Sequence, residues 1–552
     1  MLKTGKHRFD IWGIITILLI IFYALFFIYP MAHLARMAFT DTSTGEFGFS
    51  NFIKFFAKPY YSITLKNSFK VSIAATVTTM LIGVPLAYFF SIYRIRGKKI
   101  LQMLIIISSM SAPFVGAYAW ILMMGRSGVL TQLFANVLGV TLPGIYGFGG
   151  MLLVFTTQMF SLVFLYVQGA MKKMDKSLLE ASLNLGTGRI KRFFEIVLPL
   201  IVPTILASAL LVFMRVLSDF GTPMLIGEGY RTFPVALYNE FVGEVSQNKG
   251  FASAIALIAI VITTVIFLAQ KYVTNRKSFS MNALNPIEPV KAKGLTNVLV
   301  HVFSYFVVGI AILPQLYVFC TSFFKTRGVL FIDGYSLDSY RNIFDKLGKS
   351  VSNTLIIPGL ALVCVIVLAV MVAYTTVRRR NVLTGAVDML SMIPYIIPGT
   401  VLGIALLTSF NSKPLFLSGG IFIMVLALVI RRLPYTIRSS AGILHQLPIS
   451  TEEASISLGA SKMKTFWRIT IPMMSSGIIS GAILSWVTMI TELSTAMILY
   501  TGRTKTLTVA VYEQIIRGNY GIAAALSTVL TVFTVVSLLV FNKISGGDDI
   551  TM

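Results

Sequence analysis

The chain has 552 residues, of which 56% are hydrophobic and only 12% are charged. This composition is too apolar for a water-soluble protein of this length and predicts a polytopic membrane protein in contact with lipid. The net charge of +25 does not indicate nucleic-acid binding, because the basic residues gather in alternate loops, as the orientation rule for membrane proteins requires.

Apolar runs long enough to cross a bilayer recur along the whole chain. Backbone groups in lipid must bond internally, so each run is predicted to be a helix and the fold class to be an all-α membrane protein. The six spans predicted for the first half are Ile11–Tyr29, Val71–Tyr93, Ile100–Met124, Met151–Ala170, Leu200–Phe220 and Phe251–Tyr272. Those predicted for the second half, which bring the total to about 12, are Val298–Phe324, Thr354–Val377, Val387–Phe410, Phe416–Ile430, Met473–Leu499 and Ile522–Phe541.

The first apolar run follows the basic residues Lys3, Lys6 and Arg8, as in a signal peptide. No small-residue cleavage site closes a short apolar region, so we interpret the run as a retained anchor helix. With both termini in the cytoplasm, every basic cluster falls on the inner face, which is the positive-inside pattern. These clusters are Arg94–Lys99, Lys172–Arg192, Lys271–Lys277, Arg378–Arg380 and Arg431–Arg468.

An internal repeat divides the chain. Glu180–Pro199 matches Glu453–Pro472 without a gap, 273 residues later. Since six spans precede each return to the cytoplasm, both copies enter the membrane in the same direction and form parallel repeats. The predicted organisation is a first half at 1–273, a polar cytoplasmic linker at 274–294 and a second half at 295–552.

The repeated segment lies in the loop between the fourth and fifth spans of each half. In the first copy Ser177–Leu185 can form a short helix, Gly186 can end it in a left-handed turn, and an amphipathic stretch runs on to the proline that opens the next span. Helix, turn and helix make a compact knob that carries both acidic and basic side chains. Such a knob suits docking to a soluble protein.

These residues resemble the inner-membrane permease family of binding-protein-dependent ABC importers, whose EAA motif has the order Glu-Ala-Ala, glycine, and Ile-x-Leu-Pro. The principal matching residues are Glu180, Ala181, Gly186, Pro199, Glu453, Ala454, Gly459 and Pro472. The departures are Ser182 and Ser455 at the third motif position and Ile471 in place of leucine. All three exchanges keep the size class of the side chain.

The resemblance implies a type I ABC importer fold in the bacterial cytoplasmic (inner) membrane, in which each motif forms a coupling helix that rests on an ATPase subunit. It implies two ATP-binding cassette subunits on the cytosolic side and an extracytoplasmic solute-binding protein as partners. Gly348–Ser350 looks like the end of a phosphate-binding loop, but the loop's first glycine is replaced by Ile343. We therefore expect no enzyme activity and no cofactor in this chain, with ATP and Mg used by the partner ATPase.

Three other interpretations compete with this one. Two parallel six-helix repeats also describe secondary transporters of the major facilitator class, although their informative loop would follow the second span of each half rather than the fourth. The two knobs could be mere solvated basic elbows, but the positive-inside rule does not account for the spacing of Glu, Gly and Pro. A channel is disfavoured because nothing resembles a selectivity filter.

Within the permease family, the chain is most similar to the fused subfamily associated with ferric iron uptake. The residues that carry this resemblance are Ser218–Gly229 in the first half and Glu492–Ser494 in the second. Related fused permeases are linked to phosphonates, sugar phosphates and thiamine, and these solutes remain alternatives to iron.

Asp219 and Glu492 occupy equivalent repeat positions, 20 residues after Pro199 and Pro472, or about 30 Å along a helix. This places them near the outer mouth, where two pseudo-symmetric acids could guide a hard cation along a substrate pathway. Alternatively, Arg215 lies one helical turn before Asp219 and could neutralise it. Both interpretations stay open at the level of sequence, and no metal site is assigned.

Prolines interrupt several predicted spans. Pro85, Pro113, Pro394 and Pro398 all fall inside apolar runs. Such breaks can open a pathway or hinge, but they more often serve helix packing.

Overall fold

The computed structural model describes residues 11–41, 44–243, 248–276, 285–413 and 415–545. In this part of the chain almost all regular structure is helical, and the only sheet is one antiparallel hairpin. The elements of the first half are α1 (Ile11–Tyr23), η1 (Ala24–Ile28), α2 (Tyr29–Phe39), α3 (Ser50–Ala57), α4 (Pro59–Ile92), α5 (Lys98–Met110), α6 (Pro113–Met124), α7 (Val129–Leu138), α8 (Phe148–Lys172), α9 (Lys176–Asn184), α10 (Arg189–Arg192), η2 (Phe193–Val197), α11 (Leu198–Leu217), α12 (Gly221–Ile226), α13 (Phe233–Val242) and α14 (Lys249–Arg276).

The second half contains the hairpin and a matching set of helices. Its elements are α15 (Gly294–Thr321), β1 (Phe324–Arg327), β2 (Leu330–Tyr335), α16 (Asp338–Arg378), α17 (Val382–Ile396), α18 (Gly399–Ser409), α19 (Ile421–Gln446), α20 (Ile449–Ser457), α21 (Lys462–Thr465), η3 (Phe466–Thr470), α22 (Ile471–Ile490), α23 (Ala496–Leu499), α24 (Leu507–Ile516) and α25 (Tyr520–Ser545). The linker prediction falls partly on 277–284, which lie outside the described residues; on either side, α14 ends at Arg276 and α15 begins at Gly294.

The spans confirm an all-α membrane protein. In the described ranges ten helices are long and apolar enough to cross a bilayer, or eleven if the bent pair α17 and α18 is one span. Helix α19 has 26 residues, which is also long enough, but it carries three arginines. With α19 included, the number agrees with the predicted total of about 12.

The predicted third span of each half is not continuous. The first is divided between α5 and α6 before Pro113, and the second between α17 and α18, which meet at 111° around Pro398. The residue before each proline, Ala112 or Ile397, has extended backbone with ψ of 134° or 128°, because the proline ring disfavours the helical conformation there. The two prolines are thus helix breakers, whereas Pro85 and Pro394 remain inside α4 and α17.

The prediction for the fourth span of the second half was wrong in its position. The helix runs from Ile421 to Gln446 rather than ending at Ile430, so Arg431 and Arg432 lie in its middle and not in a cytoplasmic loop. Their side chains are only 16% and 11% exposed. The sequence interpretation ended the span at the first charges, because the carboxylate that neutralises both arginines lies about 60 residues away.

The two halves exchange their first helices. Helices α1 and α2 pack against α16, α17 and α18 of the second half, and α15 packs against α4, α5 and α6 of the first. Each also keeps a contact with its own half, α2 with α14 and α15 with α25. Trp12 of α1 lies 4.3 Å from the ring of Tyr374 and 4.7 Å from that of Phe466, measured between ring centroids. The apolar core is therefore continuous across the boundary between the halves.

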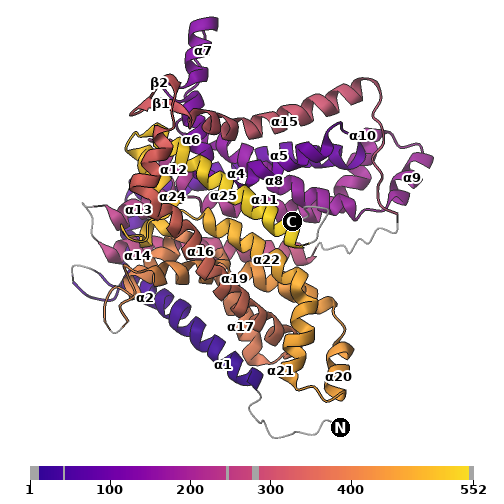
Figure 1. The fold of residues 1–552 in the computed structure, drawn as a ribbon, viewed down its shortest axis with the longest axis vertical. Helices are drawn as coiled ribbons and strands as arrows, with labels where there is room; N and C mark the ends of the chain where they lie inside the picture. The colour runs from indigo at the N-terminus through magenta and orange to yellow at the C-terminus, as the bar shows by residue number, and fades with distance from the viewer. Residues whose placement is uncertain (1–10, 42–43, 244–247, 277–284, 414, 546–552) are drawn as a thin grey trace.

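Helices α9 and α20 mark the ends of two separate arms. Figure 1 shows both on the same side of the molecule, one at the end of the first-half helices and one at the end of the second-half helices. This is the arrangement expected of parallel repeats, in which equivalent loops face the same side.

Candidate functional site

Both copies of the repeated segment form the predicted knob. Helix α9 ends before Gly186 and α20 ends before Gly459, and these glycines have φ of +75° and +87°. The backbone bonds of the two turns also correspond, with Leu185 donating to Ala181 and Leu458 donating to Ala454 over 3.1 and 3.0 Å. A left-handed turn of this kind favours glycine, and the local structure predicted around both glycines is confirmed.

Each knob continues directly into a spanning helix. The π-helical turns η2 and η3 join the short helix after each glycine turn to α11 and α22, with Leu198 donating to Phe193 and Ile471 to Phe466. Pro199 and Pro472 follow immediately after these turns. A proline cannot donate a hydrogen bond to the carbonyl four residues back, and its ring crowds that carbonyl. The backbone hydrogen bonds therefore span five residues instead of four at this point. The prolines therefore lie within continuous helices. The sequence interpretation, which had each proline open its span, was wrong on this point.

The outer surface of the knobs carries exposed apolar side chains at equivalent positions, most of all at one pair of leucines. Leu185 is 83% exposed and its equivalent Leu458 is 89% exposed, each directly before the turn glycine. Ala181 and Ala454 are also exposed. Sequence reasoning missed the two leucines, although their 273-residue spacing matches that of the motif.

The motif carboxylates lie on the surface. Glu180 pairs with Lys176 one turn earlier at 2.9 Å, and both side chains are about half exposed; this hydrogen bond raises the pKa of Lys176. Glu453 is exposed as well. The two third-position serines differ from these residues, because Ser182 is buried and Ser455 bonds the Thr465 hydroxyl at 2.9 Å, which explains why that position takes a small side chain.

The first knob is held by the linker. Asn285 makes two hydrogen bonds to the start of α9. Its carbonyl accepts from the Lys176 amide at 2.9 Å, and its amide donates to the Asp175 carboxylate at 3.2 Å. The same carboxylate caps α9 by accepting from the Ser177 amide at 2.9 Å. The linker also runs beside the residues that follow α4, through bonds of 2.8–2.9 Å that join Val290 to Ile92, Arg94 to Val290 and Arg94 to Pro289.

Replacing Asp175 with alanine is expected to destabilise the first knob alone by about 1 kcal/mol, because it removes a helix cap together with the linker bond. Hydrogen exchange of the amides in α9 should become several-fold faster, while α20 stays unchanged. The matched control is Ser461→Ala, which removes the cap of α21 in the second knob. Equal protection of α9 in the Asp175→Ala variant and in the native chain would contradict the anchoring role.

The second knob is held by an ion pair. Glu452 accepts from Arg378 at 2.9 Å and from the Tyr374 hydroxyl at 3.1 Å, and the acidic and basic side chains are only 12% and 9% exposed. Arg378 also donates to the Leu447 carbonyl at 2.9 Å. Sequence reasoning missed this anchor, since the motif directed attention to the neighbouring Glu453.

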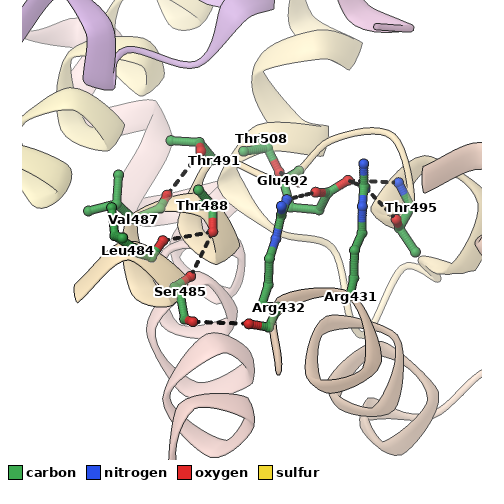
Figure 2. Close-up of polar contacts among 10 residues, drawn as sticks. All are labelled: Arg431, Arg432, Leu484, Ser485, Val487, Thr488, Thr491, Glu492, Thr495 and Thr508. Atoms are coloured by element: carbon green, nitrogen blue, oxygen red, sulfur yellow. Dashed lines mark hydrogen bonds and ion pairs between the residues drawn. The ribbon is translucent and has the colours of Figure 1, made fainter. Parts of the chain in front are cut away.

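A buried charge cluster lies where the span after the second knob ends. Glu492 is only 5% exposed in its side chain and accepts from both Arg431 and Arg432 of α19, as Figure 2 shows. Its carboxylate also caps the following turn by accepting from the Thr495 amide at 3.1 Å, and Arg431 donates to the Thr495 hydroxyl at 2.9 Å. The Thr508 hydroxyl binds the Glu492 carbonyl at 2.9 Å. The cluster therefore ties α19 to the chain between α22 and α24.

Asp219 has a simpler environment. Its carboxylate accepts from the Thr222 amide at 2.9 Å and so caps α12. Asp219 lies within electrostatic reach of Glu492. Nearby, Gly221 packs closely against Phe114 and Leu493, since an added Cβ would lie 2.9 and 3.1 Å from their side chains. The structure thus brings the two predicted acids together at the contact between the halves.

The suggested neutralisation of Asp219 by Arg215 is not observed. Among the described residues no ion pair joins these two side chains, and Arg215 is exposed. Helix α11 ends at Leu217, so the helical spacing on which that interpretation relied stops before Asp219.

Comparison with known proteins agrees with this geometry. A family model described as "Binding-protein-dependent transport system inner membrane component" matches residues 61–279 and 365–545. The ferric transport system permease protein FbpB of Actinobacillus pleuropneumoniae is 27% identical over 547 residues, covering 98% of this chain and 79% of that one. The putative ferric transport system permease protein FbpB 1 of Haemophilus influenzae is 26% identical, covering 90% and 79%.

Among solved structures, a bacterial alginate ABC transporter in complex with an alginate-bound periplasmic protein is similar over 49% of this chain and 96% of the matched chain. Its sequence identity is 18% and its TM-score 0.42. The family match covers most of the chain and falls once on each half. The protein belongs to the family of inner-membrane components of binding-protein-dependent transport systems and is a membrane-spanning permease subunit with both halves in one chain.

Proposed function

We propose that this permease imports ferric iron that a solute-binding protein delivers outside the membrane, at the expense of ATP hydrolysed by two partner subunits in the cytosol. The observation that carries the transport mechanism is the pair of knobs, which have the same turn, the same exposed leucine and the same continuous helix into the membrane. Iron as the solute is supported by the names of the relatives that match nearly the whole chain.

In this proposal the knobs face the cytosol and each contacts one ATPase subunit, which uses ATP and Mg. Glu180, Ala181, Gly186, Glu453, Ala454 and Gly459 form the contact, with Leu185 and Leu458 as its apolar centre; Pro199 and Pro472 shape the helices that carry the movement. Both chain termini lie on the same cytosolic side. Asp219 and Glu492 line the pathway between the halves, where the Asp219 carboxylate forms no ion pair with any described residue and Glu492 is held by its arginines.

The mechanism is alternating access. Closure of the ATPase subunits draws the knobs together, and because α11 and α22 continue from the knobs, their far ends separate and open the pathway outward. Hydrolysis returns the permease to the inward state. The domain division at 1–273, 274–294 and 295–552 fits this proposal, since each half carries one knob and the described part of the linker is hydrogen-bonded to the first.

The direct test is uptake of labelled ferric iron into vesicles that contain this chain with its ATPase and binding protein, with and without ATP. We expect ATP-dependent accumulation that is lost in the Glu180→Ala, Glu453→Ala double variant. Uptake of a phosphonate, a sugar phosphate or thiamine in place of iron would keep the importer and exclude iron as its solute. Uptake driven by an ion gradient without the ATPase would overturn the proposal.

Exchanging both turn glycines for valine is expected to separate ATP hydrolysis from transport. An added Cβ meets no atom within 4 Å at Gly186 or Gly459, so the cost is the positive φ alone, about 1–2 kcal/mol at each site. Uptake should fall about tenfold while the ATPase remains active. The matched control is Gly188→Val, which lies in the same loop with open space and without a positive φ; coupled transport in the double variant would refute the role of the turns.

A further inference from the structure

One face of α19 carries a stripe of cationic and phenolic side chains. Arg431, Arg432, Tyr435 and Arg438 follow one another at helical spacing and share that face; we call them the arginine–tyrosine stripe. Exposure rises along it, from 16% and 11% for the first two arginines to 57% for Arg438. The stripe therefore runs from the buried Glu492 cluster to the exposed surface of the protein.

Residues of other helices converge on Tyr435. The ring of Tyr395 in α17 lies 5.5 Å from that of Tyr435, and the Arg432 guanidinium lies 6.0 Å from the Tyr435 ring centroid. From the first half, Arg215 of α11 lies within electrostatic reach of both tyrosines and of Tyr166 in α8. The two halves of the permease thus face each other across this group.

The group is partly exposed although it lies on spanning helices. Tyr166 is 46% exposed, Tyr395 is 38% exposed, and Arg215 is exposed. An arginine in a spanning helix faces the protein interior or a water-filled path, because its charge is costly in lipid. Arg215 lies within electrostatic reach of Tyr395 and Tyr435 of the opposite half, which places this group at the boundary between the halves.

The charges of this region favour an anion. Its acids are Glu492, which binds two arginines, Asp388, which lies 3.6 Å from Arg438, and Asp219. The region contains four arginines, one more than its acids. Arg215 forms no ion pair with any described residue. The buried Nε of Arg432 also has no hydrogen-bond partner among the described residues. Nor do the described residues include any group of three His, Cys, Asp or Glu side chains that could hold a metal ion.

The stripe is not a product of the internal repeat. In α8, 273 residues earlier, the equivalent positions are Gln158, Met159, Leu162 and Leu165, and none of these is charged. A basic face in only one half is therefore not required by the repeated architecture.

We propose that Arg215 and the arginine–tyrosine stripe bind an oxyanion group, and that iron crosses the permease together with such an anion and not as a bare trivalent cation. The guanidinium groups match the paired oxygens of phosphate or carboxylate, and the tyrosine hydroxyls can donate further hydrogen bonds. The identity of the accompanying metal rests on the proposed function; the anion site itself does not.

The test uses the full complex of permease, ATPase and binding protein in proteoliposomes, with labelled iron supplied in turn with labelled phosphate, citrate or carbonate. We expect one of the three anions to accumulate with iron and to depend on ATP, which also separates a free oxyanion from a carboxylate chelator. Arg215→Gln should lower this uptake about tenfold, the value of one charge-assisted contact. Arg215→Lys, which keeps the charge but not the paired donors, should retain only part of it. Arg341→Gln, at an arginine that is 79% exposed on α16, is the control without effect.

Iron that enters without any of the three anions overturns the proposal, whatever the Arg215→Gln variant does. Labelled phosphate that enters without iron leaves the anion site standing and removes iron as the solute. If nothing enters, binding of labelled phosphate and citrate to the full complex in nanodiscs decides the question. Binding that is about tenfold weaker in Arg215→Gln supports the site, and equal binding in both proteins, or none in either, refutes it.

Discussion

Replacing Glu492 with glutamine is expected to destabilise the permease by about 3–5 kcal/mol, the cost of removing one partner from a buried ion pair. The neutral amide would leave Arg431 and Arg432 without a counter-charge in a region where both are almost buried. Thermal unfolding of the purified protein in lipid nanodiscs would measure the loss, and the middle of α19 and the end of α22 should be the first regions to exchange their amide hydrogens faster.

The matched control for Glu492→Gln is Asp219→Asn at the equivalent position of the first half. Asp219 only caps α12, and asparagine caps helices as well as aspartate, so a change below about 1 kcal/mol is expected. Combining Glu492→Leu with Arg431→Met and Arg432→Met should recover most of the stability, because it removes all the buried charges together. A Glu492→Gln variant as stable as Asp219→Asn would show that the arginines are neutralised in another way.

Replacing Glu452 with alanine is expected to release the second knob from α16. The change leaves Arg378 buried without its carboxylate and removes the acceptor of the Tyr374 hydroxyl, at a cost of about 3 kcal/mol. Because α20 is held to the membrane helices by this pair, uptake should fall while ATP hydrolysis continues. Hydrogen exchange of α20 together with vesicle uptake would measure both effects.

Glu453→Ala supplies the control for this prediction, since the two carboxylates are neighbours with different surroundings. Glu453 is exposed and belongs to the surface assigned to ATPase contact. Its removal should weaken binding of the ATPase without loosening α20. If both variants give the same hydrogen exchange in α20, the Arg378–Glu452 pair is not the anchor of the second knob.

The knobs could be predicted from sequence because their structure depends on local chemistry. A short helix, a glycine with positive φ and a proline lie within about 20 residues of one another, and the internal repeat supplies the same pattern twice. The family resemblance followed from the same pattern, whereas the fold class and the number of spans followed from the apolar runs. Pro113 and Pro398 were recognised as interruptions, and the structure shows that they break the helices.

The remaining features depend on contacts between distant residues. Arg431 and Arg432 were assigned to a cytoplasmic loop because an isolated pair of arginines is unfavourable in lipid, and only the fold reveals Glu492 beside them. The pairing of Glu452 with Arg378 and the bonds between Asn285 and the start of α9 join segments about 70 and 110 residues apart. Neither contact leaves a periodic signal in the sequence.

The exchange of first helices constrains how the protein is made. Helices α1 and α2 are made long before the second half, yet much of the surface they cover belongs to α16, α17 and α18, more than 300 residues later in the chain. During synthesis the apolar faces that contact these three helices must therefore remain in lipid or against the insertion machinery until the second half has entered the membrane. A nascent first half is an unfinished domain, and fusion of the halves guarantees that each first half meets one second half in a fixed one-to-one ratio.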